Sequence, residues 1–106
     1  VLLMAAEAYN RGGIDDGIAQ EYLNQVRRRA FGDQDHDISL TGTALTDAIW
    51  EERKFELSME GHRFFDLVRT GQAPSIIDGF QQGKHEVFPI PQQEIDISGL
   101  TQNPGY

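Results

Sequence analysis

The sequence contains no cysteine, and this absence removes several kinds of chemistry. Without a thiol there is no disulfide framework, no thiolate metal site and no cysteine nucleophile. These residues also hold no cysteine that could carry a lipid, and no cleavable signal peptide. A chain without cysteine gives no indication of whether its compartment is oxidising or reducing.

Long apolar runs and net positive charge are missing as well. No run approaches the ~20 apolar residues that a membrane-spanning helix needs. The formal net charge of the 106 residues is −8, a sign that repels nucleic-acid phosphates and anionic lipid surfaces. The one basic run, Arg27 to Arg29, ends an amphipathic segment, where cations favour a helix C-terminus. We therefore expect no nucleic-acid partner.

Two patterns of helical spacing open the chain, and residues 1–30 are predicted to form a helical hairpin. The first helix covers residues 1–11 and stops at Gly12 and Gly13. The second runs from about residue 16 to residue 30, capped by Asp15 or Asp16. The short link makes the pair antiparallel. The recurring positions are Leu2, Leu3, Ala6, Tyr9 and Asn10, then Ile18, Ala19, Tyr22, Leu23, Val26 and Ala30.

The small and large positions of this hairpin match a tetratricopeptide repeat, with Tyr9, Leu23 and Val26 in contact. One such hairpin cannot bury both of its faces alone, so it needs neighbours. No capping residue precedes the apolar start of the chain. We therefore expect a piece of a longer chain.

Residues 31–43 are polar and rich in Gly, Asp and Thr, which predicts a loop. Three aspartates stand at alternate positions in it: Asp33, Asp35 and Asp37. They begin like a calcium-binding loop, but Ile38 and Ala44 stand where that motif needs its glycine and its bidentate glutamate. The three aspartates are a weak calcium candidate, and a solvated acidic loop is the default interpretation.

Residues 44–71 are predicted to form two helices with a break near Gly61. The first is capped by Thr43 or Thr46 and runs to about Glu60. Its inward stripe consists of Leu45, Ala48, Glu52, Phe55 and Met59, with Ile49 at the flank. The second helix is short, is apolar over most of its circumference, and ends at Gly71.

Glu52 is the one carboxylate on that inward stripe, and a buried carboxylate needs a cationic or hydrogen-bonding partner. Arg63, Asp66 and Arg69 are spaced by three residues, so they line one edge of the short helix. We predict that Glu52 pairs with Arg63 or Arg69.

Residues 72–106 are predicted to be a mostly irregular tail. Pro89 and Pro91 hold Phe88 and Ile90 extended, and Pro91 suits the start of a short turn through residues 92–94. The end, GLTQNPGY, is irregular. It can stay ordered only if other parts of the protein hold it.

No pattern of catalytic or metal-ligating residues stands out. His62 and Asp66 have helical spacing but no third ligand, and no glycine elbow presents a serine. Glu51, Glu52, Glu56 and Glu60 could supply paired carboxylates, but surface ion pairs explain three of them. Trp50 is expected to pack at a helix interface under Arg53 or Lys54, although it could stack on a sugar. We expect no enzyme activity and no cofactor.

Four stretches occur in this order: AEAYNR, YLNQVRRRA, IWEERKFELSMEGHRFFDLVRTG and VFPIPQQEIDI followed by LTQNPGY. Together they resemble the C-terminal region of SusD/RagB-type proteins, and the long third block with the terminal QNPGY is highly specific. The resemblance spans essentially all 106 residues but only the last part of a family member.

The resemblance implies a mostly α-helical, tetratricopeptide-like protein, anchored as a lipoprotein at the surface of the outer membrane. It implies binding of a glycan or other nutrient and a TonB-dependent SusC-type transporter as partner. The aromatic platform of the family lies largely upstream, so no glycan-contacting residue carries over. The matched residues, including Glu52, Arg63, Asp66 and Arg69, are interpreted as scaffold.

Two alternatives remain open. A free-standing tetratricopeptide-like module that binds a partner protein predicts an exposed groove and stable folding of residues 1–106 alone. A carboxylate enzyme predicts raised pKa values on a close pair of glutamates in a pocket. The upstream sequence would decide, since the family expectation is a lipoprotein signal with its cysteine.

Overall fold

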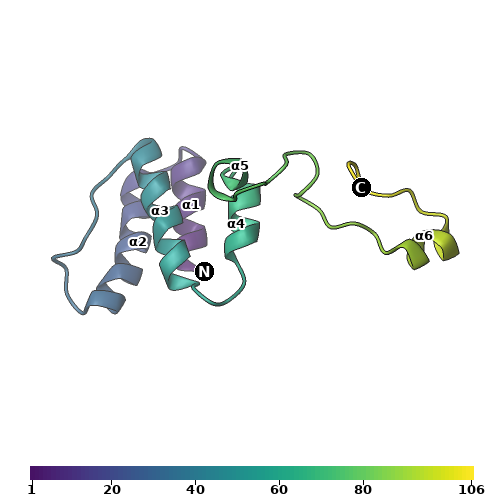
Figure 1. Ribbon diagram of the computed structural model, residues 1–106. Helices are drawn as coiled ribbons and strands as arrows, with labels where there is room; N and C mark the ends of the chain where they lie inside the picture. The colour runs from purple at the N-terminus through teal and green to yellow at the C-terminus, as the bar shows by residue number, and fades with distance from the viewer. The chain divides into compact units, whose positions relative to one another are not determined.

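The computed structural model describes residues 1–106, and all of its regular secondary structure is helical (Figure 1). The helices are α1 (Leu2–Arg11), α2 (Asp16–Phe31), α3 (Gly42–Glu56), α4 (Arg63–Arg69), α5 (Ala73–Ile76) and α6 (Gln92–Ser98). The all-α prediction is confirmed. The chain divides into two compact units, residues 1–63 and residues 64–106. No helix combines the length and the apolar character needed to cross a membrane.

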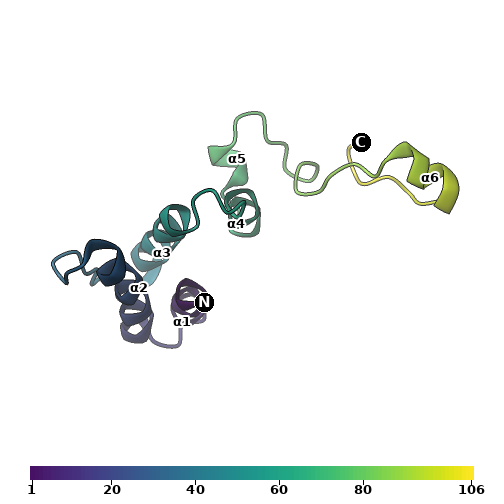
Figure 2. The ribbon, with the colours of Figure 1, turned by 90° about the horizontal axis from the view of Figure 1, so that it is seen from below.

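In the first unit, α1 and α2 form the predicted antiparallel hairpin, and α3 packs against both helices (Figures 1 and 2). The turn after α1 has Gly13 at φ 63°, and the Ile14 N–H donates to the Tyr9 carbonyl at 3.0 Å. This is the hydrogen-bond pattern of a Schellman motif, which a residue without Cβ adopts at no steric cost. Asp15 then caps α2, its carboxylate accepting the Ile18 N–H at 3.0 Å.

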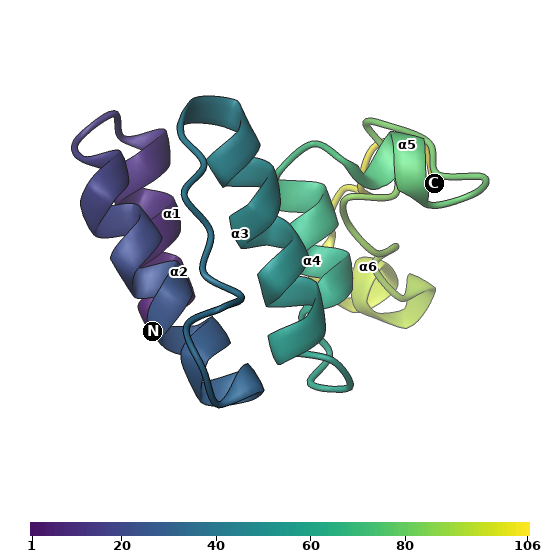
Figure 3. The same ribbon diagram turned by 90° about the vertical axis from the view of Figure 1, so that its left-hand side faces the viewer.

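The core of this unit lies between the three helices, which Figure 3 shows side by side. Its buried members are Leu3, Ala6, Ala19, Leu23, Val26, Leu45 and Ile49. Tyr9 packs against this cluster, to which Leu23 and Val26 belong, and its ring centroid lies 5.8 Å from that of Tyr22. Each fully buried leucine or isoleucine contributes roughly 1.5–3 kcal/mol. The two fully buried alanines let the helices approach closely.

α3 differs from its prediction at both ends. It begins at Gly42, with Thr41 rather than Thr43 or Thr46 in the capping position, and it ends at Glu56 rather than near residue 60. Beyond it, Met59 has a left-handed backbone (φ 69°), followed by Gly61 at φ 76°. A right-handed helix cannot continue through such residues.

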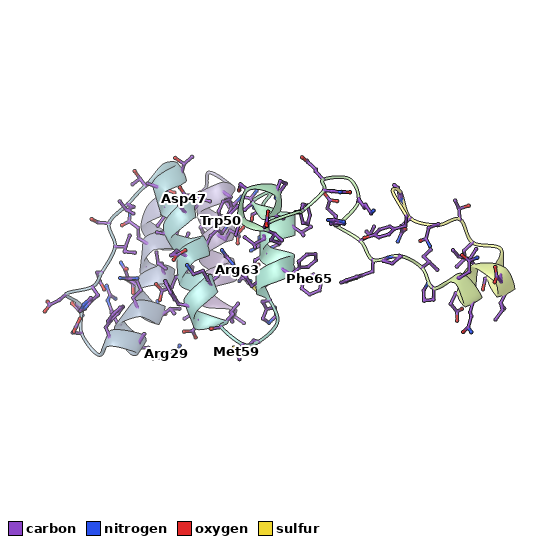
Figure 4. All side chains as sticks on the ribbon, in the orientation of Figure 1. Arg29, Asp47, Trp50, Met59, Arg63 and Phe65 are labelled. Carbon is purple, nitrogen blue, oxygen red and sulfur yellow. The ribbon has the colours of Figure 1, made fainter.

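The predicted inward stripe of α3 is therefore wrong at its C-terminal end. Met59 is fully exposed in the turn that follows α3 (Figure 4), and Phe55 is also exposed. Ile49, predicted at the flank, is fully buried instead. The side chains that α3 buries are Leu45, Ile49 and Glu52.

α4 ends at Arg69, and Gly71, with φ 74°, follows as the predicted C-terminal cap. The Gln72 N–H donates to the Leu67 carbonyl at 2.9 Å and the Gly71 N–H donates to the Val68 carbonyl at 3.1 Å. These two bonds complete a second Schellman motif. Past Pro91 the chain forms α6, which is longer than the predicted turn.

The last residues run back beside the stretch that precedes α6 (Figure 1). The Gln102 amide accepts the Ile90 N–H at 2.8 Å and donates to the Ile90 carbonyl at 2.9 Å. Asn103 Nδ2 donates to the Phe88 carbonyl at 2.6 Å, and the Tyr106 hydroxyl donates to the Val87 carbonyl at 3.0 Å. We call these contacts the C-terminal clasp. The prolines at 89 and 91 keep the bound backbone extended, so that its polar groups are open to side chains.

The clasp gives a testable expectation for Gln102→Leu, which keeps the side-chain volume but removes both bonds to Ile90. A part-buried backbone group left without its partner costs about 1–3 kcal/mol. We expect the Ile90 amide and residues 100–106 to exchange hydrogen faster, measured by hydrogen–deuterium exchange. Gln93→Leu, at an exposed position of α6, is the control and should leave both unchanged. Unaltered exchange in Gln102→Leu would refute a stabilising role for the clasp.

Candidate functional site

Glu52 is buried and paired, as predicted, but its partner is Arg27. Arg27 Nη1 donates to Glu52 Oε2 at 2.6 Å, and the two side chains are 20% and 9% exposed. Arg27 Nε also donates to the His36 carbonyl at 2.7 Å. The prediction of Arg63 or Arg69 was wrong because it considered only arginines that follow α3 closely in the sequence. Packing of α2 against α3 instead brings in an arginine one helical turn beyond the buried Leu23.

Two residues of the charged edge predicted on α4 pair with each other. Arg69 Nε donates to Asp66 Oδ1 at 2.8 Å, at a separation of three residues. Arg63, labelled in Figure 4, is the first residue of α4 and is half-buried. None of the three residues is the partner of Glu52.

The basic run at the end of α2 consists of ion-paired residues. Arg28 Nε lies 3.0 Å from both carboxylate oxygens of Asp37, and this hydrogen bonding raises the pKa of Arg28. Arg29, labelled in Figure 4, pairs with Glu56. Each arginine of the run thus holds a carboxylate, in agreement with the structural interpretation of this run.

The weak calcium candidate is not assembled. Asp33 Oδ1 accepts the Asp35 N–H at 3.0 Å and lies 2.9 Å from His36 Nδ1. The hydrogen bond with His36 lowers the pKa of Asp33. Asp37 faces Arg28 instead. Across residues 1–106, no three His, Cys, Asp or Glu side chains are grouped to hold a metal ion.

The glutamates of α3 are each engaged by a cation. Glu51 pairs with Lys54, Glu52 with Arg27 and Glu56 with Arg29. A carboxyl group that acts as a general acid near neutral pH needs a raised pKa. The shifts resolved for Asp16, Asp33 and Glu86 are all in the opposite direction, because each carboxylate accepts hydrogen bonds.

Trp50 packs at a helix interface, but the cation over its ring is neither of the two that were predicted. The Arg11 guanidinium lies 5.5 Å from the Trp50 ring centroid, whereas Lys54 lies over Phe55. The reason is that Trp50 belongs to α3, which packs against α1 (Figure 4). Its indole N–H is buried without a hydrogen-bond partner. The tryptophan therefore has the surroundings of a packing residue.

A polar junction that the sequence did not reveal joins α1, α2 and α3. It consists of Asn10, Asp16, Gly42 and Thr46. Asn10 is buried, and its Nδ2 donates to Asp16 Oδ1 at 2.7 Å and to the Gly42 carbonyl at 3.0 Å. Its Oδ1 accepts from the Thr46 hydroxyl. The Gly42 N–H donates to Asp16 Oδ2 at 2.7 Å. The junction fixes where α3 begins relative to the hairpin.

The junction lowers the pKa of Asp16 from its ordinary value of 3.8, first through the Asn10 amide and then through the Gly42 N–H. A depressed folded-state pKa gives stability that is present above the unfolded value and is lost as pH falls through the folded pKa. We expect the wild type to lose more stability than Asp16→Asn below about pH 4, measured as melting temperature between about pH 6 and pH 3. Asp47→Asn, at an exposed position of α3 (Figure 4), is the control. Parallel profiles for wild type and Asp16→Asn would contradict this.

The loop after α2 lies along that helix, held by side chains at helical spacing. Asn24 is buried, and its amide bonds both backbone groups of Ile38, at 2.8 and 2.9 Å. Gln20 Nε2 donates to the Leu40 carbonyl at 2.7 Å. Gln20, Asn24 and Arg27 follow one stripe of α2. In the sequence, the only sign of these contacts is a polar stripe on the helix followed by a polar loop. A helix face exposed to solvent has the same pattern.

The first unit also has a hollow of about 370 Å³. It is lined by Val1, Leu2, Leu3, Met4, Val26, Arg29, Arg53, Glu56, Leu57 and His62. Two of its polar members, Arg29 and Glu56, form an ion pair. The hollow is thus an apolar recess whose rim charges are already partly neutralised.

The fold defines the class as an all-α protein built on a tetratricopeptide-like hairpin, with its polar side chains used largely for internal contacts. The family model described as "SusD family" matches residues 1–86. The chain belongs to the SusD family, and the resemblance found in its motifs is confirmed.

Two curated relatives come from Formosa agariphila. SusD-like protein P25 is 34% identical over 111 residues, which cover 92% of this chain and 21% of that protein. SusD-like protein P2 is 30% identical over 122 residues, which cover 100% of this chain and 24% of that protein.

Two solved structures of SusD homologues from Bacteroides thetaiotaomicron are each 33% identical to this chain. One gives a TM-score of 0.85 over 97% of this chain and 23% of that one. The other gives a TM-score of 0.80 over 99% and 25%. The chain therefore spans about a fifth to a quarter of the length of its relatives.

Proposed function

We propose that residues 1–106 are the C-terminal part of a longer SusD-type protein that binds a glycan or comparable nutrient without changing it. The parent protein is a lipoprotein at the surface of the outer membrane, and it delivers its ligand to a TonB-dependent SusC-like transporter. The observation that carries this proposal is the match of residues 1–86 to the SusD family. The anchor and the transporter come from the family resemblance.

Within the parent protein, these residues act as scaffold and support the binding site without forming it. Protein sites for oligosaccharides combine aromatic faces with a few placed polar groups. In the first unit, Trp50 lies under Arg11, Glu52 is held by Arg27, and the Asn10 amide is used in the polar junction. Such a set of contacts stabilises helix packing and leaves little free for a ligand.

The test is isothermal titration calorimetry of the parent protein against a panel of oligosaccharides, with the 106-residue chain in parallel. We expect the parent protein to bind at least one glycan and to release no hydrolysis product. The 106-residue chain should show no tight binding. Hydrolysis of any glycan, or tight binding by the 106 residues, would overturn the proposal. If the parent protein binds peptides but no glycan, the proposed delivery to a transporter would stand and the proposed glycan ligand would be wrong.

Trp50→Phe tests whether these residues contact the glycan, because Trp50 is the one tryptophan of the chain. If these residues are scaffold, this variant of the parent protein keeps its glycan Kd within about twofold. Loss of a sugar-stacking tryptophan would instead cost roughly 1 kcal/mol or more, about fivefold in Kd. A loss of that size at an unchanged melting temperature would place the site in this segment.

A further inference from the structure

Residues 81–85 form a turn that is closed by a histidine. The His85 N–H donates to the Gln81 carbonyl at 3.0 Å, and the Gln81 N–H donates to His85 Nδ1, also at 3.0 Å. Both backbone groups of Gln81 are thus held by His85. A ring nitrogen accepts a hydrogen bond only while it carries no proton. The closed turn therefore requires His85 to be unprotonated at Nδ1.

Glu86, the next residue, uses one carboxylate oxygen and leaves the other without a partner. Its Oε1 accepts the Gly83 N–H at 2.9 Å, whereas its Oε2 is buried and makes no hydrogen bond. The Gly83 N–H is the largest cause of the lowered pKa of Glu86, so the carboxylate is ionised throughout the range in which histidines titrate. A buried acceptor without a donor is costly, and a protonated imidazole would supply the missing donor.

The same turn is in contact with the end of the chain. Lys84 Nζ lies 4.9 Å from the centroid of the Tyr106 ring. A Cβ added to Gly105 would lie 3.0 Å from Lys84 Cγ, so the tail passes close to this side chain. The Tyr106 hydroxyl donates to the Val87 carbonyl, as part of the C-terminal clasp. A rearrangement of the turn would therefore displace the groups that hold Tyr106.

The charged and titratable side chains near His85 come from three segments. Asp78, after α5, and Tyr106, in the tail, line the same hollow of about 280 Å³ as His85. Lys84 and Glu86 belong to its own segment, and α4 contributes only an apolar ring to the hollow. Asp78 is exposed. Glu86 is the carboxylate with a buried oxygen that is not in use.

We propose that His85 and Glu86 form a pH-sensitive switch that controls the C-terminal clasp. With Nδ1 unprotonated, His85 closes the turn and keeps Lys84 beside Tyr106. Once Nδ1 takes up a proton, it no longer accepts the Gln81 N–H, and the imidazolium pairs with Glu86 Oε2 instead. The turn then opens, and the tail is held less firmly. The switch goes beyond the proposed function, because it needs no ligand.

The test compares the parent protein at about pH 7.5 and about pH 5.5, a range in which histidines titrate and carboxyl groups stay ionised. Hydrogen–deuterium exchange, corrected for the intrinsic effect of pH, follows residues 80–87 and 100–106. In wild type we expect both segments to lose about fivefold in protection at the lower pH, which corresponds to the loss of roughly one hydrogen bond. His85→Asn offers an amide oxygen that accepts at either pH, so its protection should not fall.

Two further variants separate the switch from general effects of acid. Glu86→Gln keeps an acceptor for the Gly83 N–H but removes the charge, so the fall in protection should shift to a lower pH than in wild type. His62→Asn, at an exposed position of the first unit, is the control and should keep the wild-type response.

Equal protection of wild type at both pH values would overturn the proposal, and so would a fall of the same size in His85→Asn. A fall at the same pH in Glu86→Gln as in wild type would overturn it as well. Circular dichroism of each variant establishes that the parent protein is folded. The readout does not depend on a glycan, so failure of the proposed ligand class leaves this result unaffected.

Discussion

Glu52→Gln should destabilise the protein by about 3–5 kcal/mol, the typical cost of removing one partner of a buried ion pair. The substitution removes the charge that Arg27 faces at 2.6 Å across the α2–α3 interface. Arg27 then keeps its charge in a largely buried position, with the His36 carbonyl as its remaining acceptor. Differential scanning calorimetry of the parent protein measures the loss as a lowered melting temperature.

The matched control is Glu51→Gln, one position earlier on α3. Glu51 is more than half exposed and pairs with Lys54 three residues away, and exposed pairs of this kind contribute about 0–1 kcal/mol. The double variant Arg27→Gln/Glu52→Gln should lose less stability than the two single losses added together, because neither charge is then left alone. Equal small effects of Glu51→Gln and Glu52→Gln would refute the importance of the pair.

Asn10→Leu is expected to have the second largest effect, roughly 3 kcal/mol, since the buried amide makes three hydrogen bonds in the polar junction. Leucine has a similar volume, so the loss reports the hydrogen bonds and the unsatisfied partner groups. Urea denaturation followed by circular dichroism gives the change. Gln25→Leu, on the exposed side of α2, is the control and should change stability by about 0.5 kcal/mol or less.

Asn10→Leu also makes a second, independent prediction. The Asn10 amide is the largest cause of the lowered pKa of Asp16. Its removal should therefore shrink the loss of stability that wild type shows as pH falls below about 4. If Asn10→Leu is less stable at neutral pH but still loses as much stability on acidification as wild type, Asn10 does not lower the pKa of Asp16. That result would contradict the coupling of the two residues in the polar junction.

The hairpin shows how far local patterns reach. The recurrence of Ala6, Ala19, Leu23 and Val26 predicted two helices and their buried faces, and these residues are buried. The stop signals at Gly13 and Gly71 were equally local, because a positive φ is a property of one residue and its neighbours. α3 was less well predicted, since nothing in the periodicity of residues 55–59 showed that Met59 would take a left-handed backbone.

Candidate functional residues were harder to predict than helices, because their roles depend on partners far away in sequence. Glu52 was recognisable as a buried carboxylate, but its partner lies 25 residues earlier. Asn24 and Gln102 each bind both groups of one backbone peptide, of Ile38 and of Ile90. In the sequence, an asparagine or glutamine that binds a backbone peptide looks the same as one that is exposed to solvent. No spacing rule distinguishes the two cases.

The sequence by itself determined the helical class, the hairpin and the family, because helix periodicity, turn glycines and the long motif are all read from neighbouring residues. Only the tertiary structure decided which charges meet, where α3 begins and ends, and that the tail folds back on residues 87–90. The physical reason is that a buried charge or amide must be satisfied, but by any suitable group that packing brings within reach. Arg27 rather than Arg63 holds Glu52 because α2 packs directly against α3.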